Sequence, residues 1–226
     1  MALILCIETA TKVCSVALAL NGKAIAVKES KTENFSHSEN LNLFIESLFI
    51  GSKYELTDVN AIAVSMGPGS YTGLRIGAST AKGLAYGLQV PVIGIGSLLS
   101  LANQLPKKEN TLICPMFDAR RMEVYSALYN QSLDLISEVE AKVITSESYL
   151  TYLNQERIVF IGPGAEKCMD LIQHPNAIFD LNLAVSATSM ASIADIKFQK
   201  NEFENLAYFE PFYLKDFIAG KPKKLL

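Results

Sequence analysis

The amino-acid sequence predicts an α/β protein of two related lobes, each with a mixed sheet flanked by helices. Strand and helix patterns alternate along the first half in the order β-β-β-α-β-α, which is typical of this class. The same order returns in the second half at an offset of about 110 residues. Of the 226 residues, 50% are apolar and 19% are charged, which is enough apolar material for two cores.

Three short strands begin the first half. Residues 3–7 form a continuous apolar run, and residues 13–20 follow after a polar turn. Asn21-Gly22 then introduces a third strand at 23–28, because this dipeptide between apolar runs is the strongest short hairpin signal.

A helix is expected directly after these strands. Ser36 and Glu39 have the spacing of a capping box, which predicts the start of the helix. His37, in its first turn, is expected to be exposed. The apolar stripe at helical spacing consists of Leu41, Phe44, Ile45 and Leu48.

A second strand–helix pair completes the first unit. Residues 61–65 form a buried strand, residues 67–73 a glycine-rich turn, and residues 71–88 a helix. A further strand at 90–95 and a helix beginning near Ser97 follow.

The second half resembles a worn copy of the first. A strand at 112–117 ends at Asp118, as the first strand ends at Glu8. We therefore predict an N-terminal lobe of residues 1–104 and a C-terminal lobe of residues 105–226, with the last helix and tail packing back on the N-terminal lobe. The remaining elements are expected as strands at 123–129, 133–138 and 157–161 and as helices at 145–154 and 165–173.

Composition excludes several classes of protein. Mean hydropathy is +0.22, so the chain is not disordered, and a pI near 5.5 argues against binding nucleic acid alone. The uncharged stretch 83–106 is broken by Gly and Pro and is not a membrane span. Without a basic signal segment, and with four cysteines in unpaired spacing, the chain is expected in the reducing cytoplasm. The tail lysines are expected to be solvated: Lys215, Lys221, Lys223 and Lys224.

The glycine-rich turn 67–73 allows two interpretations. It follows a strand and opens a helix, where backbone N–H groups can receive an anion. Its spacing fits neither a P-loop nor a dinucleotide fingerprint, so a tight packing turn is an equal alternative.

Two strand ends could form a phosphate or metal cleft. Glu8, Thr9 and Thr11 lie in the first turn, and Asp118 is the mirrored carboxylate of the second half. The alternatives are a solvated hairpin at the first site and an Asp–Arg pair that stabilises the turn at the second.

Catalytic and metal chemistry have few candidates. The two histidines, His37 and His174, lie in unrelated surroundings, and there is no Gly-x-Ser-x-Gly elbow. We assign no catalytic residue and no metal ligand.

The two helices of the first half are candidates for a partner interface. The second carries small residues on one side, which would let another helix approach closely, although packing on the chain's own sheet explains them as well. The candidate interface residues are Leu41, Phe44, Leu48, Gly69, Tyr71, Leu74, Ala78 and Ala81.

Five segments carry a recognisable family pattern. They are ILCIETATKVCSVALAL (4–20), GPGSYTGLRIG (67–77), PVIGIGSLLSLA (91–102), FDARRMEVY (117–125) and PFYLK (211–215). In this order they resemble the TsaB family, also called YeaZ. The resemblance implies an actin-like ATPase (ribonuclease H-like) fold and a role in forming N6-threonylcarbamoyladenosine at position 37 of tRNAs that read ANN codons.

The resemblance also implies partners. A TsaB protein is the partner of the catalytic TsaD, pairs with it through its first two helices, forms homodimers alone, and works with a TsaE-like ATPase as third subunit. It implies that this chain needs no cofactor, that ATP or ADP could lie at the complex interface, and that tRNA is contacted only indirectly.

Two departures bear on mechanism. TsaD has a His-x-x-x-His metal pair where this chain reads Gly96-Ser-Leu-Leu-Ser-Leu-Ala102, and serine and leucine cannot replace imidazole ligands. The chain also reads Gly162-Pro163-Gly164 where its family has Gly-Asp-Gly, which argues against nucleotide contact by that loop. We therefore expect a non-catalytic scaffold. The alternatives are a stand-alone actin-like ATPase or small-molecule kinase, and a direct tRNA-binding module.

Overall fold

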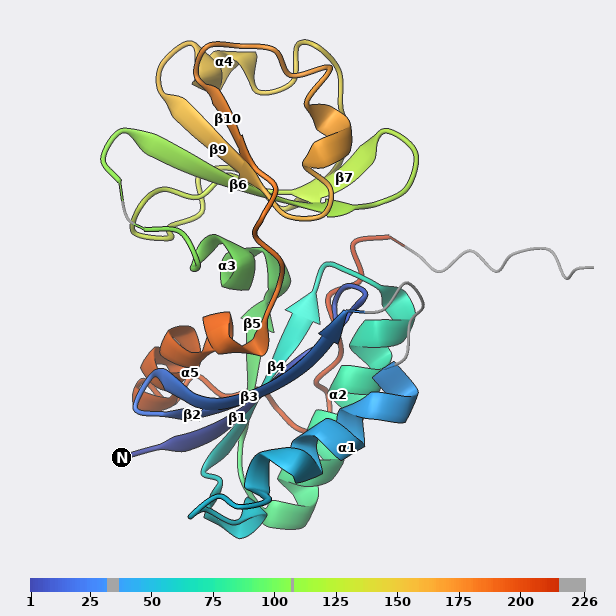
Figure 1. Ribbon diagram of the computed structural model, residues 1–226, viewed down its shortest axis with the longest axis vertical. Coiled ribbons are helices and arrows are strands. Elements are labelled where there is room, and N and C mark those ends of the chain that lie inside the picture. Colours follow the sequence, from blue (N-terminus) through green and yellow to red (C-terminus); the bar gives the residue numbers. More distant parts are fainter. Residues whose placement is uncertain (32–36, 107, 216–226) are drawn as a thin grey trace, which may run out of the picture.

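Two five-stranded sheets, one in each lobe, form the framework of the protein (Figure 1). The computed structural model describes residues 1–31, 37–106 and 108–215. The predicted cap Ser36 and the tail lysines Lys221, Lys223 and Lys224 lie outside these residues.

The N-terminal lobe has the strand order β3-β2-β1-β4-β5. The central strand β1 pairs antiparallel with β2 and parallel with β4, and each of these pairs with an outer strand. The bounds are β1 Leu3–Glu8, β2 Val13–Leu20, β3 Lys23–Lys31, β4 Ala61–Gly67 and β5 Val92–Gly96.

Helices cover both faces of this sheet. Because side chains alternate along a strand, Leu3, Leu5 and Ile7 of β1 face one core while Ile4 and Cys6 face the other. This explains why β1 is apolar without interruption. The first core is closed by α1 (His37–Phe49) and α2 (Tyr71–Leu88), and the second by α5 (Ala191–Gln199).

The C-terminal lobe repeats this topology, with the order β10-β9-β6-β7-β8. Its central strand β6 pairs antiparallel with β7 and parallel with β9, as β1 pairs with β2 and β4. The predicted duplication is therefore confirmed. The bounds are β6 Thr111–Asp118, β7 Glu123–Ser126, β8 Glu140–Val143, β9 Arg157–Ile161 and β10 Ala177–Asp180.

Three predicted elements of this lobe were wrong. The third strand lies at Glu140–Val143 and not at 133–138, because the chain turns first at Asn130 and Leu133 takes a left-handed φ of 66°. The helix expected at 145–154 is only α4 (Leu150–Leu153), since the Ser148 hydroxyl accepts from the Thr145 N–H and ends regular structure. The helix expected at 165–173 is a short 3-10 turn, Glu166–Cys168. Two further 3-10 turns, Leu56–Asp58 and Ala187–Met190, are present.

A further core joins the two lobes. It is centred on α3 (Ser97–Ala102), which lies between the lobes in Figure 1, and it contains residues of both sheets. Its buried members include Ala10, Val13, Leu74, Leu98, Leu101, Ile113, Phe117, Tyr129 and Ile161.

The chain then returns to the N-terminal lobe. After α5, residues 200–215 pass β5, where the Glu204 N–H bonds to the Val92 carbonyl at 2.9 Å, and continue to β4, where the Phe212 N–H bonds to the Met66 carbonyl. We call this segment the C-terminal strap. Phe209 of the strap is buried in the core beneath α1 and α2. In the described part of the chain, no helix has the length and apolar character needed to cross a membrane.

Candidate functional site

The first predicted site residue, Glu8, is enclosed completely by the chain. It ends β1, and its Oε1 accepts a hydrogen bond from the Ala10 N–H at 2.7 Å. The other oxygen, Oε2, makes no hydrogen bond within the described residues. Glu8 is thus not the solvated hairpin carboxylate that the sequence left open as an alternative.

Burial changes the acidity of Glu8. Removing the carboxylate from water raises its pKa to about 7, and hydrogen bonds involving Ala10, Ser65 and Thr9 offset only part of this. The residue therefore carries a proton near neutral pH in much of the population.

The glycine-rich turn is a packing device. A Cβ on Gly69 would lie 2.4 Å from the Ala10 carbonyl oxygen, and one on Gly73 would lie 2.1 Å from that of Thr9. Two backbone donors at this helix start bond within the chain: the Ser70 N–H to the Ala10 carbonyl at 2.6 Å, and the Gly73 N–H to Ser70 Oγ at 3.2 Å. The glycines thus let the first turn of the N-terminal lobe pack directly against the start of α2.

The same device recurs in the C-terminal lobe, which sequence reasoning missed. Gly67-Pro68-Gly69 follows β4, and Gly162-Pro163-Gly164 follows the corresponding strand β9. Gly67 and Gly162 have φ values of +109° and +93°, which side chains rarely adopt. A Cβ on Gly164 would lie 2.8 Å from the Phe117 carbonyl carbon, just as Gly69 abuts Ala10. The repeated tripeptide was the available signal.

Asp118 stabilises its own turn. Its Oδ1 forms an ion pair with Lys167 Nζ and accepts a hydrogen bond from the Arg120 N–H at 2.9 Å. Partial burial alone would raise its pKa, but the hydrogen bonds from Lys167 and Arg120 lower the pKa below the usual value. Asp118 thus bonds to a lysine side chain and to the backbone of Arg120. It does not form the Asp–Arg ion pair that the sequence offered as an alternative. Asp118 and Glu8 have no bonding partner in common.

His37 was wrongly predicted to be exposed. It is 1% exposed, and its Nε2–H donates to the Thr11 carbonyl at 2.7 Å. Burial lowers the pKa of the imidazole against the opposing effect of this hydrogen bond. The histidine therefore fastens α1 to the first turn.

Most of the candidate interface residues are buried within the chain itself. Five of the eight residues point into the core of the N-terminal lobe or the core between the lobes, because the small and apolar stripe packs on the chain's own sheet. Only Phe44, Gly69 and Tyr71 are partly exposed. The five buried residues are Leu41, Leu48, Leu74, Ala78 and Ala81.

The opposite side of the same two helices is exposed, and apolar residues lie on it among charged ones such as Glu46. Leu43 is 60% exposed, Ile50 76% and Tyr86 79%. In α2, a Cβ on Gly83 or Gly87 would meet nothing within 4 Å, so the fold of the chain does not require glycine there. We call these three apolar residues and two glycines the outer face of α1 and α2. The available signal was that Leu43 and Ile50 lie seven apart, off the predicted stripe.

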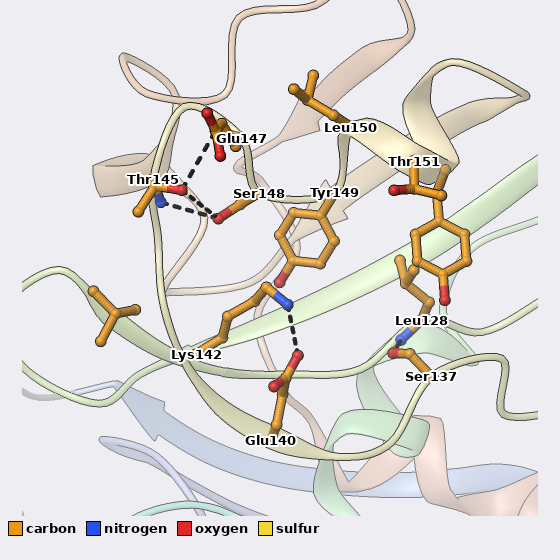
Figure 2. Close-up of a pocket in the computed structure, with 12 residues that line it drawn as sticks. Leu128, Ser137, Glu140, Lys142, Thr145, Glu147, Ser148, Tyr149, Leu150 and Thr151 are labelled. Carbon is orange, nitrogen blue, oxygen red and sulfur yellow. Dashed lines mark hydrogen bonds and ion pairs between the residues drawn. The ribbon is translucent and has the colours of Figure 1, made fainter.

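A groove of about 450 Å³ opens on the C-terminal lobe between β8 and α4 (Figure 2). Its polar groups bond to one another: Lys142 Nζ lies 2.7 Å from Glu140 Oε1, and the Thr145 N–H donates to Ser148 Oγ. Sequence analysis named none of these residues. These pairs leave the lysine and one acidic side chain of the groove neutralised by each other.

A smaller cavity of about 120 Å³ lies at the junction of the lobes, between Gly67, Gly96, Tyr129 and Phe212. Small-molecule sites usually have volumes of several hundred Å³. Within the residues that the structure describes, no group of three or more His, Cys, Asp or Glu side chains is placed to hold a metal ion. All four cysteines are buried and free.

Comparison with known proteins gives one consistent result. A family model described as "TsaD: tRNA N6-adenosine threonylcarbamoyltransferase" matches residues 31–226. The chain is 31% identical over 225 residues to the tRNA threonylcarbamoyladenosine biosynthesis protein TsaB of Escherichia coli K12, covering 96% of each chain. It is 28% identical to the protein of the same name from Haemophilus influenzae, covering 96% of this chain and 95% of that protein.

The solved structures agree. YeaZ from Pseudomonas aeruginosa superposes with a TM-score of 0.77 at 27% identity, covering 95% of this chain and all of that one. A second P. aeruginosa structure, described as similar to peptidase YEAZ, gives a TM-score of 0.80 with the same identity and coverage. The chain therefore belongs to the TsaB (YeaZ) family and has its two-lobed, actin-like ATPase fold.

Proposed function

We propose that this chain takes part in the biosynthesis of tRNA threonylcarbamoyladenosine as a non-catalytic subunit that binds and activates a TsaD-like transferase. The names of its relatives support the pathway. The outer face of α1 and α2 is the single observation that supports the partner role.

The outer face is suited to a helical partner. Glycine within a helix is less favourable than alanine by about 1 kcal/mol, and no neighbour in this chain requires it at Gly83 or Gly87. Missing side chains let a second helix approach closely, and the exposed Leu43, Ile50 and Tyr86 supply apolar area to bury. The glycines of one copy can receive the apolar side chains of another. The outer face can therefore also join two copies of this chain when the partner is absent.

The rival function, a stand-alone ATPase or small-molecule kinase, receives less support. It needs an open phosphate-binding turn, but Glu8 is enclosed, and the N–H groups of Ser70 and Gly73 at the start of α2 bond within the chain. The loop at Pro163 also lacks the N–H and carboxylate of the family's usual residue.

The test is association with the TsaD-like protein of the same organism, measured by size exclusion with light scattering. Gly83→Arg places a long cation on the outer face without a clash inside the chain, so we expect the heterodimer to be lost and threonylcarbamoyl transfer to tRNA to fall with it. Ile196→Arg on α5, where Ile196 is 53% exposed, is the matched control and should leave both unchanged. A heterodimer of normal affinity with Gly83→Arg would contradict the assigned surface, and full transfer activity without this chain would contradict the function.

A further inference from the structure

The turn between β6 and β7 holds two arginines in an unfavoured backbone conformation. Arg120 and Arg121 have φ values of 71° and 51°, both in the left-handed region that favours glycine and asparagine. Both residues are exposed. Non-glycine residues held in this backbone region cluster at functional sites. The two arginine side chains are therefore candidates for a binding role.

A lysine inside the turn maintains this conformation. Lys167 Nζ pairs with the Asp118 carboxylate and donates to the carbonyls of Arg121 at 2.7 Å and Glu123 at 2.8 Å. By contrast, the guanidinium groups of Arg120 and Arg121 form no ion pair within the described residues. The turn therefore presents two unpaired cations to the surroundings of the protein.

The C-terminal strap brings more groups of the same kind to this place. Lys215 pairs with Glu123 at the base of the turn, and two residues earlier the Tyr213 ring lies 4.7 Å from the Tyr71 ring at the start of α2. The Arg75 guanidinium lies 5.4 Å from the centre of the same Tyr71 ring. Figure 1 shows the end of the strap beside the start of α2, at the side of the junction between the lobes.

These residues form one surface, which we call the basic junction surface: Arg75, Tyr71, Tyr213, Lys215, Arg120 and Arg121. Its four cations, with Lys167 a fifth, outnumber the three carboxylates beside them, Asp118, Glu123 and Glu210, although the chain as a whole has a net charge of −3. An acidic pI therefore describes the molecule but not this region. The extended chain from Tyr213 to Lys215 alone spans up to about 7 Å. The surface is therefore longer than a single phosphate group.

An extended array of arginines beside half-exposed aromatic rings fits a polyanion with planar bases. Arginine binds phosphate through paired N–H donors, and tyrosine rings stack on bases. We propose that the basic junction surface binds the phosphate backbone of tRNA when this chain is in complex with its TsaD-like partner. The proposal rests on the proposed function, since the partner brings the tRNA. Arg75 lies on α2, so the surface continues towards the outer face.

The test uses the double variant Arg120→Asn/Arg121→Gly. Asparagine and glycine accept a left-handed φ, so the melting temperature should be no lower than that of the wild type, while both cations are removed. Binding of unmodified tRNA to the complex of both subunits is measured by fluorescence anisotropy between 50 and 200 mM salt, a range in which phosphate contacts are resolved. We expect affinity to fall about ten-fold at low salt and the slope of log K against log salt to decrease by about 1.5, the value for two lost phosphate contacts.

The matched control is Lys23→Gln/Lys28→Gln on β3, which removes the same charge from exposed positions of the N-terminal lobe. It should leave the affinity and the salt slope unchanged. Equal losses in both double variants would show a general charge effect and overturn the proposal, as would unchanged binding by the arginine variant.

Complex formation is measured on the same samples without tRNA. If the wild-type chain forms no complex with the TsaD-like protein, the proposed function fails. If the arginine variant loses the complex rather than the tRNA, the surface contacts protein and the RNA assignment is wrong. A normal complex with normal tRNA binding contradicts the basic junction surface alone.

Discussion

Glu8 is a carboxylic acid enclosed by apolar and polar neighbours at the end of the central strand of the N-terminal lobe. Its pKa is raised to about 7 from an ordinary value of 4.5. Below pH 4.5 the folded and unfolded states both carry the proton, and Glu8 has no effect on stability. Between pH 4.5 and about pH 7 the unfolded state releases the proton and the folded state keeps it. The free energy of unfolding therefore falls as pH rises through this range.

We predict that Glu8→Gln removes this decline. Glutamine keeps an oxygen that can accept from the Ala10 N–H but does not ionise. The stability of the variant relative to the wild type should therefore increase by up to about 3 kcal/mol between pH 4.5 and pH 8. Urea unfolding of both proteins at four pH values in this range measures the difference. Parallel profiles would mean that Glu8 ionises in the folded state as readily as in the unfolded one.

Two glycines of α2 differ in what surrounds them. A Cβ on Gly77 would lie 2.3 Å from Thr9 Oγ1, whereas one on Gly83 would meet nothing within 4 Å. We predict that Gly77→Ala destabilises the protein by about 1–3 kcal/mol through overpacking. Gly83→Ala should stabilise it by about 0.5–1 kcal/mol through the better helix propensity of alanine. Denaturant unfolding of the isolated chain compares the pair, and effects of the same sign in both would contradict the assigned packing.

At the scale of elements, the C-terminal strap shows how a segment without regular structure is fixed. Lys82 of α2 donates to the carbonyls of Ala207 at 3.3 Å and Phe209 at 3.0 Å. Further along, the Phe212 N–H bonds to the Met66 carbonyl at 2.6 Å, and Phe212 lies against Gly67. One lysine thus connects the helix to the strap that leads to the lobe junction.

We predict that Lys82→Met loosens the strap while the helix remains intact. Methionine keeps the aliphatic part of the side chain but loses both charge-assisted hydrogen bonds, each worth about 1.5–3 kcal/mol. Hydrogen exchange should become at least ten-fold faster at the amides of Glu204 and Phe212. Lys53→Met serves as control, because Lys53 is exposed and lies over the neighbouring Tyr54 ring, away from the strap. Unchanged exchange at Phe212 would show that the other contacts of the strap hold it without Lys82.

At the scale of the whole molecule, the core around α3 connects the two lobes. It takes side chains from β6 and β9 of one lobe and from the first turn and α2 of the other. Leu101 is fully buried at its centre, and a Cβ on Gly162 would lie 2.6 Å from it. Neither lobe can unfold without exposing this shared apolar surface.

We therefore predict a single unfolding transition for the isolated chain, with equal calorimetric and van't Hoff enthalpies. Leu101→Ala should lower the free energy of unfolding by about 2–5 kcal/mol and shift the whole transition. Val143→Ala, at a site 63% exposed, should change it by less than about 0.5 kcal/mol. Two separate calorimetric peaks in the wild type would contradict a common core.

Local patterns determined most of the N-terminal lobe. The helix predicted at 71–88 has these bounds in the structure, and the strand positions differ by no more than three residues at either end. In each of these elements, the spacing of the apolar residues and the residues of the adjoining turns indicate the element locally. The C-terminal lobe was predicted less well, because the hydroxyls of Thr145 and Ser148 and the left-handed Leu133 override the apolar pattern.

The sequence by itself determined the fold class, the duplication, the family and the helices that carry the proposed partner surface. Only the tertiary structure decided which side of those helices is exposed, because the same apolar stripe can face a sheet or a partner. It also decided that Glu8 is enclosed and that Arg120, Lys215 and Arg75 share one surface. These residues come from three distant segments, and their proximity depends on contacts between segments that no local pattern records.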